Sequence, residues 1–92
     1  MAKLILFDQF GYKNMSKEFR SNDPDLTLNG DDFQFASAIV ISGEWTLYPD
    51  ANFGGNPVSL GTNGGADADG AYKDVADWGA TQAFVVRSIQ HN

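Results

Sequence analysis

The sequence has 92 residues, no cysteine, and 12 acidic against 6 basic residues, which give a net charge of −6. A chain of this length has room for one domain with one hydrophobic core. The lack of cysteine excludes disulfides and thiolate metal sites. Because phosphate backbones and anionic membranes attract basic patches, the negative charge opposes both. We therefore expect a single domain over residues 1–92 with neither a nucleic-acid nor a membrane partner.

The first apolar run ends at Asp8, which makes it too short for a signal peptide. No other run approaches the ~20 apolar residues of a membrane-spanning helix. We expect a soluble, cytoplasmic monomer whose protein partners the sequence does not indicate. A leader removed from the mature chain would leave no trace, so a secreted protein stays open.

Short β-rich runs separated by Gly, Asn, Asp and Pro dominate the chain, and helical periodicity is absent. The runs predict strands near residues 2–7, 15–20, 34–42, 44–48, 56–60 and 82–90, with one short strand in each of the irregular segments 21–33 and 61–81. About eight strands in so short a chain predict an all-β fold with two packed sheets.

A pattern of aromatic, four residues, aromatic, one residue, then Gly or Asn occurs twice. The first copy holds Phe7, Tyr12 and Asn14, and the second holds Tyr48, Phe53 and Gly55. Two packed aromatics followed by a residue that tolerates positive φ suit a folded hairpin, so positive φ is expected at Asn14. A later strand in each half carries one serine, Ser37 or Ser88. The repeat predicts two motifs, about 1–42 and 44–92, that share one core.

These paired motifs resemble the βγ-crystallin family, as a single microbial-type domain of two Greek-key motifs. The likeness is most specific in segments 48–55, 42–48 and 72–79. It implies a sandwich of two four-stranded sheets related by a pseudo-twofold axis. It also implies that the two serines bond to hairpin backbone, and that the domain is not an enzyme.

The resemblance further implies a place for calcium in each motif, with the pattern Asn/Asp-Asn/Asp-x-x-Ser/Thr-Ser. One ion would take a hairpin carbonyl, the third-position carbonyl and the fifth-position hydroxyl, and an acid or amide at the second position of the other copy. This chain reads Asp32-Phe33-Gln34-Phe35-Ala36-Ser37 and Ala83-Phe84-Val85-Val86-Arg87-Ser88.

Both copies depart from this pattern. The second positions are Phe33 and Phe84, and the fifth positions are Ala36 and Arg87. The ligands that remain, mostly backbone carbonyls, lie at Asp8, Asp32, Gln34, Pro49 and Val85. Since affinity follows ligand charge and number, we expect calcium to bind weakly or not at all and no cofactor to be required. A shifted register with Asp31-Asp32 as the acidic pair would keep part of the first site.

Other polar groups favour structural explanations. The run Asp67-Ala68-Asp69-Gly70 lacks the rest of an EF-hand loop and is expected to form a turn. The acidic residues between Asp23 and Asp32 are expected to cap bends. Segment 62–71 exceeds its counterpart in the first half and is expected to be a surface insertion.

Trp45 and Trp78 are expected in structural packing rather than in a sugar-binding platform. The one histidine, His91, is expected to lie in a frayed terminus, so no catalytic triad can be assigned. Three functions stay open: a structural or stress-type protein with degenerate calcium sites, a calcium-binding module, and a secreted inhibitor or toxin on the same fold.

Overall fold

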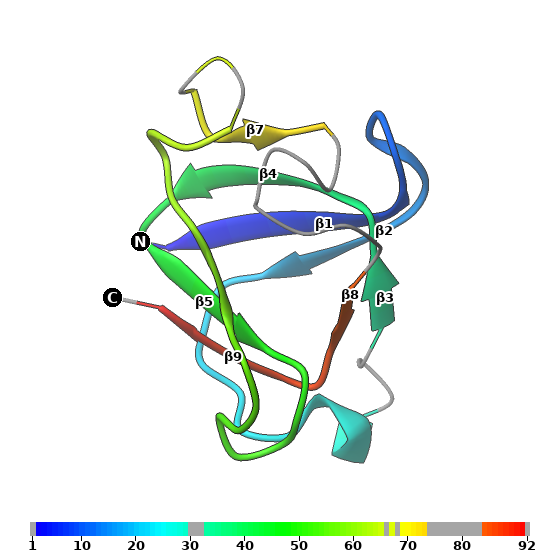
Figure 1. The fold of residues 1–92 in the computed structure, drawn as a ribbon, viewed down its shortest axis with the longest axis vertical. Helices are drawn as coiled ribbons and strands as arrows, with labels where there is room; N and C mark the ends of the chain where they lie inside the picture. Colours follow the sequence, from blue (N-terminus) through cyan, green and yellow to red (C-terminus); the bar gives the residue numbers. More distant parts are fainter. Residues whose placement is uncertain (1, 30–32, 66, 68, 74–83, 92) are drawn as a thin grey trace.

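A computed structural model describes residues 2–29, 33–65, 67, 69–73 and 84–91 (Figure 1). Its strands are β1 (Lys3–Gln9), β2 (Lys13–Phe19), β3 (Phe33–Phe35), β4 (Ser37–Ser42), β5 (Trp45–Tyr48), β6 (Val58–Leu60), β7 (Ala71–Tyr72), β8 (Phe84–Val86) and β9 (Ser88–His91). The described residues hold one short 3₁₀ helix, η1 (Leu26–Asn29), and no α-helix. The predicted all-β fold is confirmed.

Antiparallel strands form one sheet in the order β2-β1-β4-β7 and another in the order β6-β5-β9. Strand β7 comes from the second half of the chain but extends the sheet of the first half (Figure 1). In return, Asp23 of the first half forms a single bridge with Ile89 of β9. This exchange of segments makes a Greek-key sandwich.

In the described part of 21–29, the strand expected in 21–33 is reduced to that one bridge, so the second sheet has three described strands instead of four. The side chain of Asp23 accepts a hydrogen bond from the Asp25 backbone, and the side chain of Asp25 accepts one from Thr27. Such Asx turns bend the chain and compete with sheet pairing. The bend-capping role predicted for Asp23 and Asp25 is thereby confirmed; Asp31 and Asp32 lie outside the described residues.

Strands β3 and β8 pair with each other and relate the two halves. Gln34 lies opposite Val85, and these residues hold the same position in the two sequence copies. The flanking pairs are Phe33 with Val86 and Phe35 with Phe84, which interchange equivalent positions. A pseudo-twofold axis therefore passes between Gln34 and Val85.

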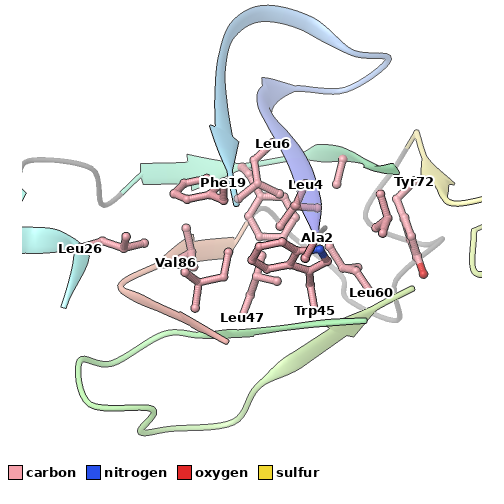
Figure 2. Packing of buried hydrophobic residues seen from close by; sticks show 14 residues of the cluster. Ala2, Leu4, Leu6, Phe19, Leu26, Trp45, Leu47, Leu60, Tyr72 and Val86 are labelled. Carbon is pink, nitrogen blue, oxygen red and sulfur yellow. The ribbon is translucent and has the colours of Figure 1, made fainter. Parts of the chain in front are cut away.

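The core fills the space between the sheets (Figure 2). Leu4 and Leu6 alternate with less buried neighbours along β1, as expected for a strand with one buried face. Trp45 and Leu47 face them from β5, and Trp45 is only 1% exposed. The structural role predicted for Trp45 is confirmed, while Trp78 lies outside the described residues.

The two serines fasten the hairpins as expected, and both are fully buried. Ser37 Oγ accepts a bond from the Tyr12 amide (3.0 Å) and donates one to the Gln9 carbonyl (2.5 Å). Ser88 Oγ repeats this with Phe53 (3.0 Å) and Asp50 (2.6 Å). Each hydroxyl thus satisfies one donor and one acceptor of a folded hairpin.

The aromatic pairs also match between hairpins. The rings of Phe7 and Tyr12 pack edge to face with centroids 5.7 Å apart, and those of Tyr48 and Phe53 at 5.5 Å. Asn14 has φ of 69°, so the predicted positive φ is confirmed. Tyr12 and Phe53 also have positive φ, near 60°, which the sequence pattern did not indicate.

The frayed terminus expected at His91 is wrong. His91 pairs with Trp45 in the β5–β9 ladder, and the centroids of their two rings lie 4.9 Å apart. Its amide also donates to the side chain of Asn22. The terminal segment is held because it completes a strand against a buried tryptophan.

The surface insertion expected at 62–71 is also only partly right. Gly70 is buried, and its carbonyl accepts a bond from Val40 of β4. The Tyr72 hydroxyl accepts a bond from the Gly61 amide at 2.9 Å and lies 3.3 Å from the Gly61 carbonyl. The segment is tied to the sheet at both ends, although Asp69 caps a turn as predicted by accepting a bond from Ala71.

Candidate functional site

The described calcium positions lie in the two hairpins and on the paired strands β3 and β8. Gln34 and Val85 lie beside the pseudo-twofold axis on β3 and β8, while Asp8 lies near the end of β1 and Pro49 follows β5. Asp32 lies outside the described residues. Asp8 and Gln34 line one depression, the first region, while Pro49 lies in the second hairpin, the second region, and Val85 lies opposite Gln34.

In the second region a cationic side chain is hydrogen-bonded to the carbonyl that was predicted to bind the ion. The guanidinium of Arg87 donates a hydrogen bond of 2.8 Å to the Pro49 carbonyl, which is the hairpin carbonyl expected to bind the ion. The Arg87 amide also donates to the carbonyl of Tyr48, which fixes the backbone beneath the side chain. The fifth position of this motif thus supplies a positive charge where the expected calcium pattern has Ser or Thr.

In the first region a depression of about 490 Å³ is lined by Asp8, Gln9, Phe10, Lys13, Gln34 and Ala36. The carboxylate of Asp8 is already engaged, since it accepts bonds from Asn14 Nδ2 (2.9 Å) and from the Met15 amide (3.1 Å). Ala36 contributes no hydroxyl, and the cationic residue Lys13 is part of the lining. Divalent cations need several oxygen ligands and no competing cation, so this set of side chains disfavours tight binding of such an ion.

Among the described residues no three His, Cys, Asp or Glu side chains gather closely enough to hold a metal ion. The sequence indicated that Arg87 would lie near an ion, but not that it would bond to Pro49. It gave no sign of Lys13, because Lys13 follows the second aromatic of its hairpin at a position without assigned function. Only the fold places it beside Gln34 and Ala36.

The described residues that line the first region include no histidine, no cysteine and no hydroxyl side chain that could serve as a nucleophile. His91 packs its ring against Trp45 at the far end of β9.

The described helix is far too short to cross a bilayer.

Comparisons with known proteins agree with the fold described above. A family model described as Beta/Gamma crystallin matches residues 3–91. A beta/gamma-crystallin of Ciona intestinalis is 29% identical over 79 residues, covering 86% of each chain. The solved structure of a Ciona intestinalis beta gamma crystallin superposes with a TM-score of 0.77 at 26% identity, over 98% of this chain and 99% of that one.

A transition-metal-ion-binding betagamma-crystallin from Methanosaeta thermophila also superposes, with a TM-score of 0.67 at 26% identity, covering 95% of this chain and 96% of that one. The family match spans nearly the whole chain, and the paired hairpins, their serines and the exchanged segments agree with it. This chain belongs to the Beta/Gamma crystallin family.

Proposed function

We propose that this domain is a non-catalytic structural module whose hairpins are held by protein side chains instead of a calcium ion. The observation that carries the proposal is the bond from Arg87 to the Pro49 carbonyl. Calcium would have to displace this bond and then sit beside the guanidinium, and both steps cost free energy.

The first motif supports the same proposal by different means. The Asn14 side chain and the Met15 amide both donate hydrogen bonds to the carboxylate of Asp8. That carboxylate therefore already stabilises its own hairpin. Lys13 lines the same depression, and its positive charge opposes the binding of a divalent cation there.

A metal-binding module is the second candidate. It is favoured by the first depression, where Asp8 and Gln34 still present oxygen atoms, and by the metal-binding relative from Methanosaeta thermophila. Under this alternative, the ion would stabilise the folded state by linkage.

Urea unfolding in chelator and in calcium separates the two candidates. If the domain is a structural module, its free energy of unfolding should be the same in both solutions. The difference should stay within the roughly 1.4 kcal/mol that about 1 mM calcium supplies to a site with Kd near 10⁻⁴ M. A stabilisation well above this value would support the metal-binding module instead.

A further inference from the structure

The depression of the first region has the size of a small-molecule site. Its volume of about 490 Å³ lies within the range of ligand pockets in proteins. The β1–β2 hairpin contributes Phe10 and Lys13 to the lining, β3 contributes Gln34, and Ala36 precedes β4. The Ala36 amide donates to the Phe7 carbonyl at 2.9 Å, which joins the end of β3 to β1. The hairpin and β3 are therefore held together around the depression.

Three polar side chains of the lining are available to a ligand. The side chains of Gln9, Lys13 and Gln34 are exposed and form no hydrogen bond or ion pair with another described residue. Gln9 and Lys13 are opposite each other in the β1–β2 ladder, so their side chains share a face of the hairpin. Each amide can donate two hydrogen bonds, and the ammonium can donate three. The depression thus has unused donors, one of which is cationic.

The acidic side chain among the described residues of the lining is Asp8, and its carboxylate is already used. Its Oδ2 accepts the hydrogen bond from Asn14, and its Oδ1 accepts the one from the Met15 amide. A bound cation would have to share or displace these donors. The side chains that stay available therefore favour an anionic group over a cationic one.

An apolar ring lies beside these donors. Phe10 lines the depression and is 53% exposed, although large aromatic side chains usually contribute to a core. The aromatic pair that folds this hairpin is Phe7 with Tyr12, so Phe10 is not needed for that packing. Its counterpart in the second hairpin is Ala51, which shows that the hairpin fold does not require a ring at this position.

The polar side chains of the depression also have no equivalent in the second motif. Gly54 stands in the place of Lys13, and Val85 stands in the place of Gln34. Both hairpins are nevertheless fastened by the same serine bonds. The fold that the two motifs share therefore does not account for these side chains, which are specific to the first motif.

We propose that the depression of the first region binds a small aromatic carboxylate. The carboxylate accepts hydrogen bonds from Lys13 and Gln34, and the ring of the ligand packs against Phe10. This site goes beyond the structural role proposed above, and it needs no metal ion.

The test uses cinnamate and isotope-labelled, chelator-treated protein in a two-dimensional NMR titration. We expect saturable shifts of the Phe10, Lys13 and Gln34 amides with a Kd on the order of 1 mM, which is usual for a molecule with so few atoms. Cinnamamide has the same ring without the charge, and acetate has the charge without the ring. Each should bind at least about fivefold more weakly than cinnamate, because each lacks one of the two interactions.

The charge and the ring are also tested on the protein. Lys13→Met should weaken cinnamate binding about fivefold to tenfold, whereas Lys3→Met, with the same change in net charge outside the depression, should leave the Kd within about twofold. Phe10→Ala should weaken binding about threefold to tenfold, and Leu28→Ala, an exposed apolar side chain elsewhere, is its control. If a variant does not fold, the three probes on the parent protein still decide the outcome.

Several results would overturn the proposal. One is the absence of saturable cinnamate shifts at the three amides, and another is equally tight binding of cinnamamide or acetate. Cinnamylammonium, the cation with the same ring, is the opposite probe, and its binding as tightly as cinnamate would mean that the depression prefers cations. An equal effect of Lys3→Met and Lys13→Met would mean that net charge, rather than Lys13, attracts the carboxylate.

Discussion

The guanidinium of Arg87 lies 2.8 Å from the carbonyl oxygen of Pro49 and donates a hydrogen bond to it. The two residues come from opposite ends of the second motif and meet only because β9 pairs with β5. A hydrogen bond from a charged donor to a carbonyl is stronger than one from a neutral donor. The bond therefore holds the second hairpin to the final strand without an ion.

The buried serines should contribute equally to stability. Replacing either Ser37 or Ser88 by alanine leaves a hairpin amide and carbonyl without their partner, at a cost of about 1–3 kcal/mol. Urea unfolding measures the loss, and Ser59→Ala on the exposed face of β6 is the control, expected to change stability by less than about 0.5 kcal/mol. Unchanged stability in both buried variants would contradict the fastening role.

The last hairpin position should tolerate glycine but not a Cβ in the second motif. Gly55 has φ of 81°, and a Cβ there would approach Pro49 Cγ to 2.5 Å, so Gly55→Ala should cost about 2–3 kcal/mol. Asn14→Gly relieves its positive φ but loses the bond to Asp8, so it should be nearly neutral. Asn14→Val should cost about 1–2 kcal/mol. If Asn14→Gly and Asn14→Val were equally stable in thermal melts, the left-handed conformation at Asn14 would be refuted.

The segment after β6 should be sensitive where it meets Tyr72. Tyr72→Phe leaves the Gly61 amide without its hydroxyl partner and should cost about 1–3 kcal/mol. A methyl group at Gly64 would overlap the Tyr72 hydroxyl, so Gly64→Ala should also destabilise the fold. Asn63→Ala, in the same segment but exposed, is the matched control. A free surface loop would instead leave all three variants as stable as the parent in chemical unfolding.

The terminal histidine should matter to the core. His91→Ala removes a ring packed against Trp45 and should cost about 1 kcal/mol, with a change in tryptophan fluorescence. Gln90→Ala alters the exposed face of the same strand and should have a smaller effect. Equal stability of both variants and the parent would mean that β9 is frayed at this point.

The sequence predicted most of the fold because the hairpins have a local signature. The spacing of Phe7, Tyr12 and Asn14 is set by one folded turn, and it recurs in the second motif. The strands expected near 2–7, 44–48 and 56–60 are present with small shifts in their bounds.

The features that the sequence did not predict depend on contacts distant in the chain. Arg87 bonds to a backbone carbonyl, and every residue offers such a carbonyl, so the sequence pattern could not identify Pro49 as its partner. Lys13 reaches the first depression only through the packing of β1 and β2 near β3. His91 was misjudged because position near a terminus says nothing about strand pairing with Trp45.

Calcium calorimetry on chelator-treated parent and Arg87→Ser proteins tests the central proposal most directly. The parent should give no binding heat, or a Kd no tighter than about 10⁻⁴ M, whereas Arg87→Ser frees the Pro49 carbonyl, restores a hydroxyl and should bind calcium more tightly. Adding Phe33→Asp, at the second position of the other motif, should tighten it further. Micromolar binding by the parent that is lost in Asp32→Ala would contradict the account, because it would show that the first motif keeps a working calcium site.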